Sequence, residues 1–184
     1  MIYKHRGFII AALCIGALTL GPHGSSGLWI IPWNLGIALR IWARRYIGAH
    51  TRLGELAAPV LALGGPYAWL RHPLYLSNIL IICGGIGFWL GFGYDWLLLT
   101  LLSVSFYDYL AHAEDLFLQK AFADSWSQWK LRVPYAFVPM RRVGMPQVRA
   151  DRNWFQAVWA DHWTWLWMGL TLIGMLWFRR MHGI

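Results

Sequence analysis

Charged residues are scarce in this sequence. Only 13% of its 184 residues are Asp, Glu, Lys or Arg, whereas about 25% is usual in a soluble domain. Hydrophobic residues make up 58% of the chain and aromatic residues 17%. This composition excludes a disordered chain and argues against an ordinary soluble enzyme. We therefore expect an integral membrane protein.

Cysteine is nearly absent, since Cys14 and Cys83 are the only two. Both fall inside apolar stretches, where small packing residues are more usual than a disulfide or a metal pair. The sequence therefore predicts no metal site.

Acidic residues number eight against sixteen Lys and Arg. A basic balance can indicate nucleic-acid binding, but here the basic residues lie beside apolar stretches and no recognition motif accompanies them. Basic loops between apolar segments are typical of a bacterial inner-membrane protein. We expect the membrane, and no nucleic acid, as a partner.

No charged residue occurs in the stretches 7–39, 72–94, 96–107 and 162–178. A helix needs about 20 mostly apolar residues to cross a bilayer, and the first stretch is broken by a glycine-rich turn at 21–27. The fold expected is an all-α membrane bundle of about five spans, because the stretches lack the alternation of a barrel. The expected spans lie near 7–21, 27–45, 73–92, 95–112 and 155–178.

The expected organisation is a single membrane domain over 1–184, with a first helical hairpin at 1–52, a core at 53–140 and a membrane segment at 154–184. Basic residues follow the second and fourth expected spans, which predicts that the N-terminus, 46–71 and 113–153 face the cytoplasm. Arg179 and Arg180 disagree with this rule if the last segment spans. That segment is therefore left as either spanning or interfacial.

An irregular polar segment precedes the third expected span. Gly64-Gly65-Pro66 breaks any helix, and Pro73 restricts His72 to an extended conformation. Irregular backbone at membrane depth is tolerated where it lines a cavity. The segment can thus form a polar ligand site, although a basic membrane-entry anchor explains it equally well.

A second segment, 113–133, has the pattern of an amphipathic helix. Leu118, Phe122, Trp126 and Trp129 share one face. We expect this cytoplasmic helix to lie along the membrane surface or to cap the bundle. Glu114-Asp115, just before it, suits either a helix N-terminus or a cationic ligand.

Together the two segments resemble the isoprenylcysteine carboxyl methyltransferase family of integral membrane methyltransferases. The resemblance covers roughly residues 60–140 and depends on order and spacing. The matching residues are Tyr67, Arg71-His72-Pro73-Leu74-Tyr75, Glu114-Asp115, Leu118, Phe122, Trp126, Trp129, Arg132-Val133-Pro134 and Pro139.

The resemblance implies a methyltransferase that takes S-adenosylmethionine from the cytosol, releases S-adenosylhomocysteine and methylates a lipid or prenylated small molecule from the bilayer. Its donor site would contain Tyr67, Arg71, His72, Pro73, Leu74, Tyr75 and Glu114. Glu114 can receive the ammonium group of the donor, and Arg71, His72 or a tyrosine hydroxyl its carboxylate. In-line methyl transfer needs alignment rather than a covalent nucleophile.

Several positions depart from the family pattern, and they concern the acceptor. Leu110 stands where family members that methylate a prenylcysteine carry an Arg that receives the carboxylate. Trp126 and Trp129 replace tyrosines, and Ala123 replaces a glycine. Leu110, Trp126 and Trp129 are therefore the candidate acceptor-binding residues. The candidates for catalysis are His112, Tyr109 and Arg132.

Two alternatives remain open. Membrane sterol reductases share an Arg-His-Pro-x-Tyr segment and bind NADPH, but they are much longer chains. A non-catalytic membrane protein that retains the fold is the other alternative.

Overall fold

The computed structural model describes residues 16–22, 27–47, 61–140 and 148–182, and these contain helices and no strand. The all-α prediction is confirmed for them. Most of the first expected span, with Cys14, lies outside the described residues. The elements are η1 (Gly27–Trp29), α2 (Ile30–Arg44), η3 (Gly65–Ala68), α3 (Pro73–Leu90), α4 (Tyr94–Arg132), α5 (Trp154–Trp159) and α6 (His162–His182).

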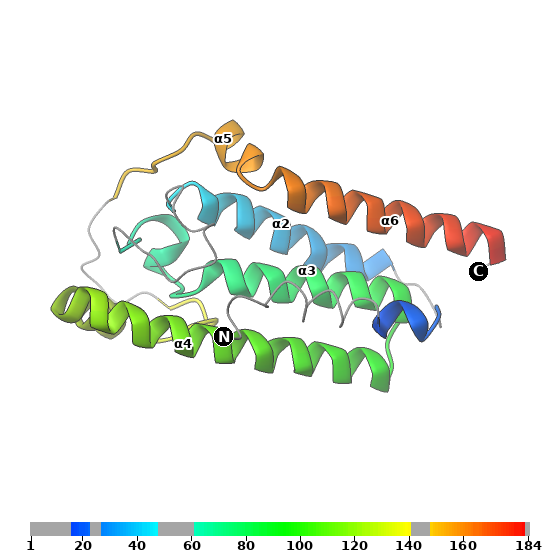
Figure 1. The fold of residues 1–184 in the computed structure, drawn as a ribbon, viewed down its shortest axis with the longest axis horizontal. Coiled ribbons are helices and arrows are strands. Elements are labelled where there is room, and N and C mark those ends of the chain that lie inside the picture. Colours follow the sequence, from blue (N-terminus) through cyan, green and yellow to red (C-terminus); the bar gives the residue numbers. More distant parts are fainter. Residues whose placement is uncertain (1–15, 23–26, 48–60, 141–147, 183–184) are drawn as a thin grey trace.

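The long helices lie side by side in the order α6, α2, α3 and α4 (Figure 1). Helices α2 and α3 are antiparallel and very close, because a Cβ atom added at Gly36 would come within 2.8 Å of the Ser77 carbonyl oxygen. Near the other end of α3, a Cβ atom added at Gly84 would lie 2.8 Å from the backbone nitrogen of Trp33. Small residues of this kind let two helix backbones approach closely.

Among the helices of the described residues, only α3 is long and apolar enough to cross a membrane. The count of five spans is therefore not confirmed. Helix α6 is nevertheless tied to its neighbours near both of its ends, since Asp161, just before it, pairs with Arg40 of α2 and Arg179 reaches the C-terminal end of α3. Arg179 donates hydrogen bonds of 2.7 and 3.3 Å to the carbonyl oxygens of Phe88 and Trp89. A cation at a helix C-terminus is favourable, which gives Arg179 a local structural role.

The expected boundary between a span at 95–112 and a helix at 113–133 is wrong. Both belong to α4, and the interruption falls at Ala123, whose φ is 38° and ψ −105°. Glu114 and Asp115 therefore lie in the middle of a helix and do not serve a helix N-terminus. Nothing in a Glu-Asp pair breaks a helix, so the run continues through it.

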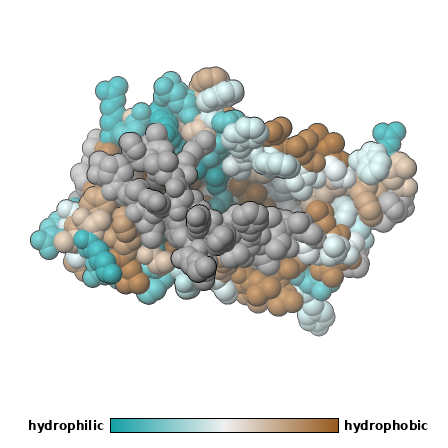
Figure 2. All heavy atoms as spheres, viewed as in Figure 1, coloured by the Kyte–Doolittle hydropathy of each residue, from teal (hydrophilic) through white to brown (hydrophobic). Residues whose placement is uncertain are grey.

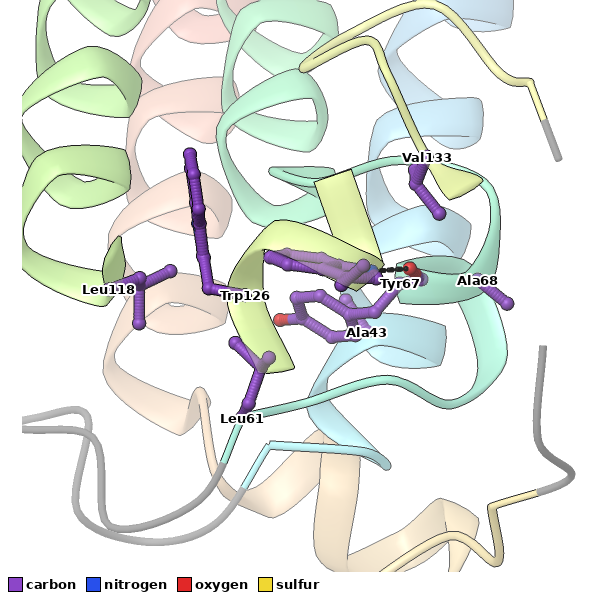
Figure 3. Close-up of a cluster of buried hydrophobic side chains, with 8 residues drawn as sticks. Ala43, Leu61, Tyr67, Ala68, Leu118, Trp126 and Val133 are labelled. Atoms are coloured by element: carbon purple, nitrogen blue, oxygen red, sulfur yellow. Dashed lines mark hydrogen bonds between the residues drawn. The ribbon is translucent and has the colours of Figure 1, made fainter. Parts of the chain in front are cut away.

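The predicted amphipathic face of this region is confirmed. Leu118, Trp126 and Trp129 are buried in one cluster with Tyr67, and Phe122 packs against that cluster. Figure 3 shows Leu118 and Trp126 of α4 in one cluster with Tyr67, which comes from the turn before α3. The second half of α4 thus caps the end of the helix bundle instead of lying apart from it.

Candidate functional site

A tight turn leads into the site. Gly65 has a φ of +56°, and a Cβ atom added there would come within 2.3 Å of the Tyr46 ring. Only glycine fits a left-handed backbone in such close contact. Pro66 then occupies the second position of the short helix η3, and Pro73 occupies the first position of α3. Proline is favoured there because its missing N–H has no partner in the first helical turn.

The chain after α4 returns to Arg71 and His72 and fixes their backbone. The Arg71 nitrogen donates to the Tyr135 carbonyl oxygen at 3.3 Å, and the His72 nitrogen donates to that of Ala136 at 3.2 Å. The Arg71 guanidinium also donates to the carbonyl oxygens of Val133 and Pro134. The Arg-Val-Pro part of the sequence pattern therefore serves to hold the Arg-His-Pro part.

The side chains of Arg71 and His72 meet the acidic pair of α4. One oxygen of Asp115 lies 3.0 Å from an Arg71 Nη atom, and the other lies 3.0 Å from His72 Nε2. His72 Nδ1 is 3.6 Å from the Glu114 carboxylate. Asp115 is therefore engaged in positioning, while the Glu114 side chain lines the cavity described below.

These contacts determine the protonation of the cluster. Burial on its own lowers the pKa of His72, but the Asp115 and Glu114 carboxylates, which accept from its ring and attract its charge, outweigh burial and the pKa lies above its usual value of 6.5. For Asp115, burial raises the pKa, but His72 and Arg71 more than compensate and hold it below 3.8. Both shifts favour the charged form of the group, the imidazolium of His72 and the carboxylate of Asp115.

A second charged cluster joins α2 to the start of α6. Nε of Arg40 and Nε of Arg44 donate to the same Asp161 oxygen, at 2.8 and 2.7 Å. Arg40 also donates from Nη1 to the side-chain oxygen of Asn78 on α3. All three charged residues of this cluster are buried.

One cavity of about 750 Å³ connects the two clusters. Its polar end is lined by Tyr67, Glu114, Arg40 and Arg44, and its other end is lined by apolar residues of α3 and α6. These apolar and flanking residues are Ile81, Ile82, Gly85, Ile86, Trp89, Thr164, Trp167, Met168, Thr171 and Met175. Ligand pockets of about 300–1,000 Å³ with a few converging polar groups are the usual form of a small-molecule site.

The structure brings all seven candidate donor-site residues to this cavity: Tyr67, Arg71, His72, Pro73, Leu74, Tyr75 and Glu114. The candidates for catalysis and for acceptor binding do not line it. Tyr109 and His112 are exposed, and Arg132 is half-buried away from it. Leu110, Trp126 and Trp129 are packed in the hydrophobic core, so their position in the sequence pattern reflects packing.

Sequence reasoning missed Arg40, Arg44 and Asn78 as cavity residues, because the two arginines were interpreted as topology signals. Two features could have identified them. Arg40 and Arg44 are one helical turn apart and so face the same side of α2. Asp161 is an acid at the edge of an otherwise apolar segment, where a partner is expected.

No family model matches the chain, and no solved structure matches it. The chain is 30% identical over 144 residues to a protein of Cupriavidus metallidurans named cobalt-zinc-cadmium resistance protein CzcN. The aligned region covers 71% of this chain and 61% of that relative. Among the described residues, no group of three or more His, Cys, Asp or Glu is placed to hold a metal ion.

Proposed function

We propose that this chain is an integral membrane methyltransferase that uses S-adenosylmethionine and acts on a lipophilic acceptor. The observation that carries the proposal is the single cavity, whose polar end is formed by the Arg-His-Pro-x-Tyr segment and Glu114 and whose other end is apolar. A polar methyl donor at one end of this cavity and an apolar acceptor at the other end would meet inside the cavity, with no protein wall between them.

The polar end suits the methyl donor. Glu114 supplies a carboxylate for its ammonium group, and Tyr67 and Tyr75 supply aromatic walls. The Tyr67 hydroxyl and the Arg71 Nε atom are buried and have no hydrogen-bond partner within the described chain. Buried polar atoms are rarely left without partners, and a ligand with several polar groups would satisfy them. When bound, the donor supplies the electrophilic methyl group.

The chain's own part in the reaction is to bind, to align and to exclude water. The cluster of Arg71, His72 and Asp115 fixes the turn on which Tyr67 lies. Trp129 of the hydrophobic core also donates a hydrogen bond from Nε1 to the Tyr67 carbonyl oxygen. Effective molarities of well-aligned reactants correspond to roughly 7–11 kcal/mol of the barrier. Such alignment requires rigid walls, which this hydrogen-bonded turn provides.

The outer surface of the helices supports a place in the bilayer. Leu97, Leu98, Leu101 and Leu102 of α4 are exposed, as are Trp163, Leu166, Trp167, Leu170, Ile173 and Trp177 of α6. Figure 2 shows brown, hydrophobic atoms over these two helices, with hydrophilic atoms gathered near α5. Exposed apolar surface of this extent marks contact with lipid or protein. We place the helices in a bacterial inner membrane as a bundle of about five spans, with the polar end of the cavity facing the cytoplasm.

Ligand-induced stabilisation of the full chain in detergent tests the proposal. A ligand that binds only the folded state stabilises it by RT ln(1 + [L]/Kd), which raises the melting temperature. We expect S-adenosylhomocysteine to raise the melting temperature and NADPH to leave it unchanged. A shift with NADPH instead would support a reductase. No shift with either ligand would contradict both the methyltransferase and the reductase function.

Glu114→Gln sharpens this test. Loss of the carboxylate should weaken S-adenosylhomocysteine binding about tenfold, since a hydrogen bond to a charged group is worth about 1.5–3 kcal/mol. The matched control is Asp108→Asn, an exposed acid on the same helix outside the cavity. Unchanged affinity of Glu114→Gln would remove Glu114 from the donor site.

A separate experiment identifies the acceptor. The wild-type chain is incubated with a methyl-labelled donor and a lipid extract, and the lipid that receives the label is identified.

A further inference from the structure

The cluster of Arg40, Arg44 and Asp161 reaches the cavity through its two arginines, which line the cavity wall. Its three charges come from α2 and from the start of α6, outside the region that matches the sequence pattern. Residues 27–47 and 148–182 therefore contribute a chemical feature of their own to the cavity.

Arg40 is the residue of this cluster that faces the boundary between polar and apolar walls. Its Nε donates to Asp161 and its Nη1 to Asn78, whereas its Nη2 donates to no residue of the described chain. Asn78 lies one turn beyond the polar residues at the start of α3, and the wall further along is apolar from Ile81 onward. The Nη2 group of this buried guanidinium is therefore suited to donate to a second anionic partner.

The apolar part beyond Arg40 has the length for a hydrocarbon chain. Asn78 to Trp89 are eleven positions apart, which is roughly 16 Å at 1.5 Å per helical residue. Met168, Thr171 and Met175 of α6 line the side facing α3, and methionine adapts well to flexible apolar ligands. A molecule placed here with its polar group at Arg40 would extend its chain along α3 and α6.

We propose that Arg40, supported by Arg44, binds the anionic group of an amphiphilic acceptor whose hydrocarbon chain fills the apolar end of the cavity. The inference rests on the proposed function and names the class of acceptor for the same site. It also accounts for Leu110, which is fully buried in the core and supplies no charge. The positive charge for the acceptor comes from α2 instead of α4.

Equilibrium binding of two radiolabelled probes, dodecanoate and dodecanol, to the full chain in detergent tests the inference. They have the same chain length and differ in the charge of the polar group. We expect dodecanoate to bind more tightly than dodecanol and Arg40→Met to weaken dodecanoate about tenfold, since a charge-assisted hydrogen bond is lost. Arg40→Met should leave dodecanol unchanged. Equal binding of the two probes to the wild type would overturn the inference.

Two further variants separate binding from folding. Arg45→Met is the matched control, because Arg45 lies over the Trp154 ring at 4.0 Å and does not line the cavity. Asp161→Asn removes the carboxylate that competes for Arg40, so dodecanoate should bind severalfold more tightly, opposite to the effect of Arg40→Met. A cluster that only ties α2 to α6 would weaken binding in both variants, and that result would also overturn the inference.

S-adenosylhomocysteine binding distinguishes failure of this inference from failure of the proposed function. We expect Arg40→Met to bind it as the wild type does. If Arg40→Met instead weakens S-adenosylhomocysteine and spares dodecanoate, the cluster serves the carboxylate of the donor and the inference is wrong. If the wild type binds dodecanoate through Arg40 and binds no S-adenosylhomocysteine, the anion site stands and the methyltransferase proposal falls.

Discussion

Nε2 of His72 and Oδ1 of Asp115 lie 3.0 Å apart, although 43 positions separate the two residues in the sequence. The other Asp115 oxygen binds Arg71, so one carboxylate fixes two consecutive residues of the turn before α3. Glu114, its neighbour, lies 3.6 Å from His72 Nδ1 and also lines the cavity. The acidic pair thus divides into a positioning residue and a candidate ligand-binding residue.

The first prediction concerns this positioning role. Asp115→Asn should lower the free energy of unfolding by about 3 kcal/mol, because removing one partner leaves Arg71 and His72 buried without their counter-ion. Thermal unfolding in detergent measures the effect. Asp124→Asn is the control, since Asp124 is exposed on the same helix. Similar stability of the two variants would show that the buried pair contributes little.

The second prediction concerns pH. The pKa of His72 is raised in the folded protein, so its contribution to stability is present below about pH 6.5, the unfolded value, and is lost as the pH rises through the folded value. The difference in melting temperature between wild type and His72→Gln should therefore shrink from pH 5 to pH 9. His112→Gln, at an exposed position, should keep the wild-type slope. A difference between wild type and His72→Gln that grows with pH would contradict the assigned contacts.

The sequence was informative where local chemistry determines the structure. The breaks at Gly65 and Pro73 and the buried face of Leu118, Trp126 and Trp129 follow from backbone and periodicity rules, and the structure confirms them. The family resemblance also named seven residues that the structure gathers around one cavity. Their predicted role in donor binding stays a prediction.

Features that depend on packing between distant segments could not be predicted. Arg40 has the same local sequence signature whether it marks topology or pairs with Asp161, which lies 121 positions further along the chain. The continuity of α4 through Glu114 was missed for a related reason. An acidic pair after an apolar stretch resembles a helix start until Arg71 and His72 are known to face it.

The third prediction concerns the turn at Gly65. Gly65→Ala should destabilise the protein by about 1–3 kcal/mol, because the backbone is left-handed there and the added Cβ meets the Tyr46 ring. Gly93→Ala is the comparison, since nothing lies within 4 Å of a Cβ atom at Gly93 and no left-handed φ is required. Chemical denaturation should show a large loss for the first variant and little for the second. Equal losses would contradict the assigned strain.

The fourth prediction concerns the interruption of α4. Ala123 has a φ of 38°, which is unfavourable for a residue with a Cβ atom, and its side chain is exposed. Ala123→Gly should therefore stabilise the protein by about 1 kcal/mol, since glycine adopts this backbone without strain. Ala121→Gly, two residues earlier in regular helix, should destabilise it by about 1 kcal/mol through the helix propensity of glycine. Opposite shifts in melting temperature are expected, and a loss in both variants would show that α4 continues unbroken through Ala123.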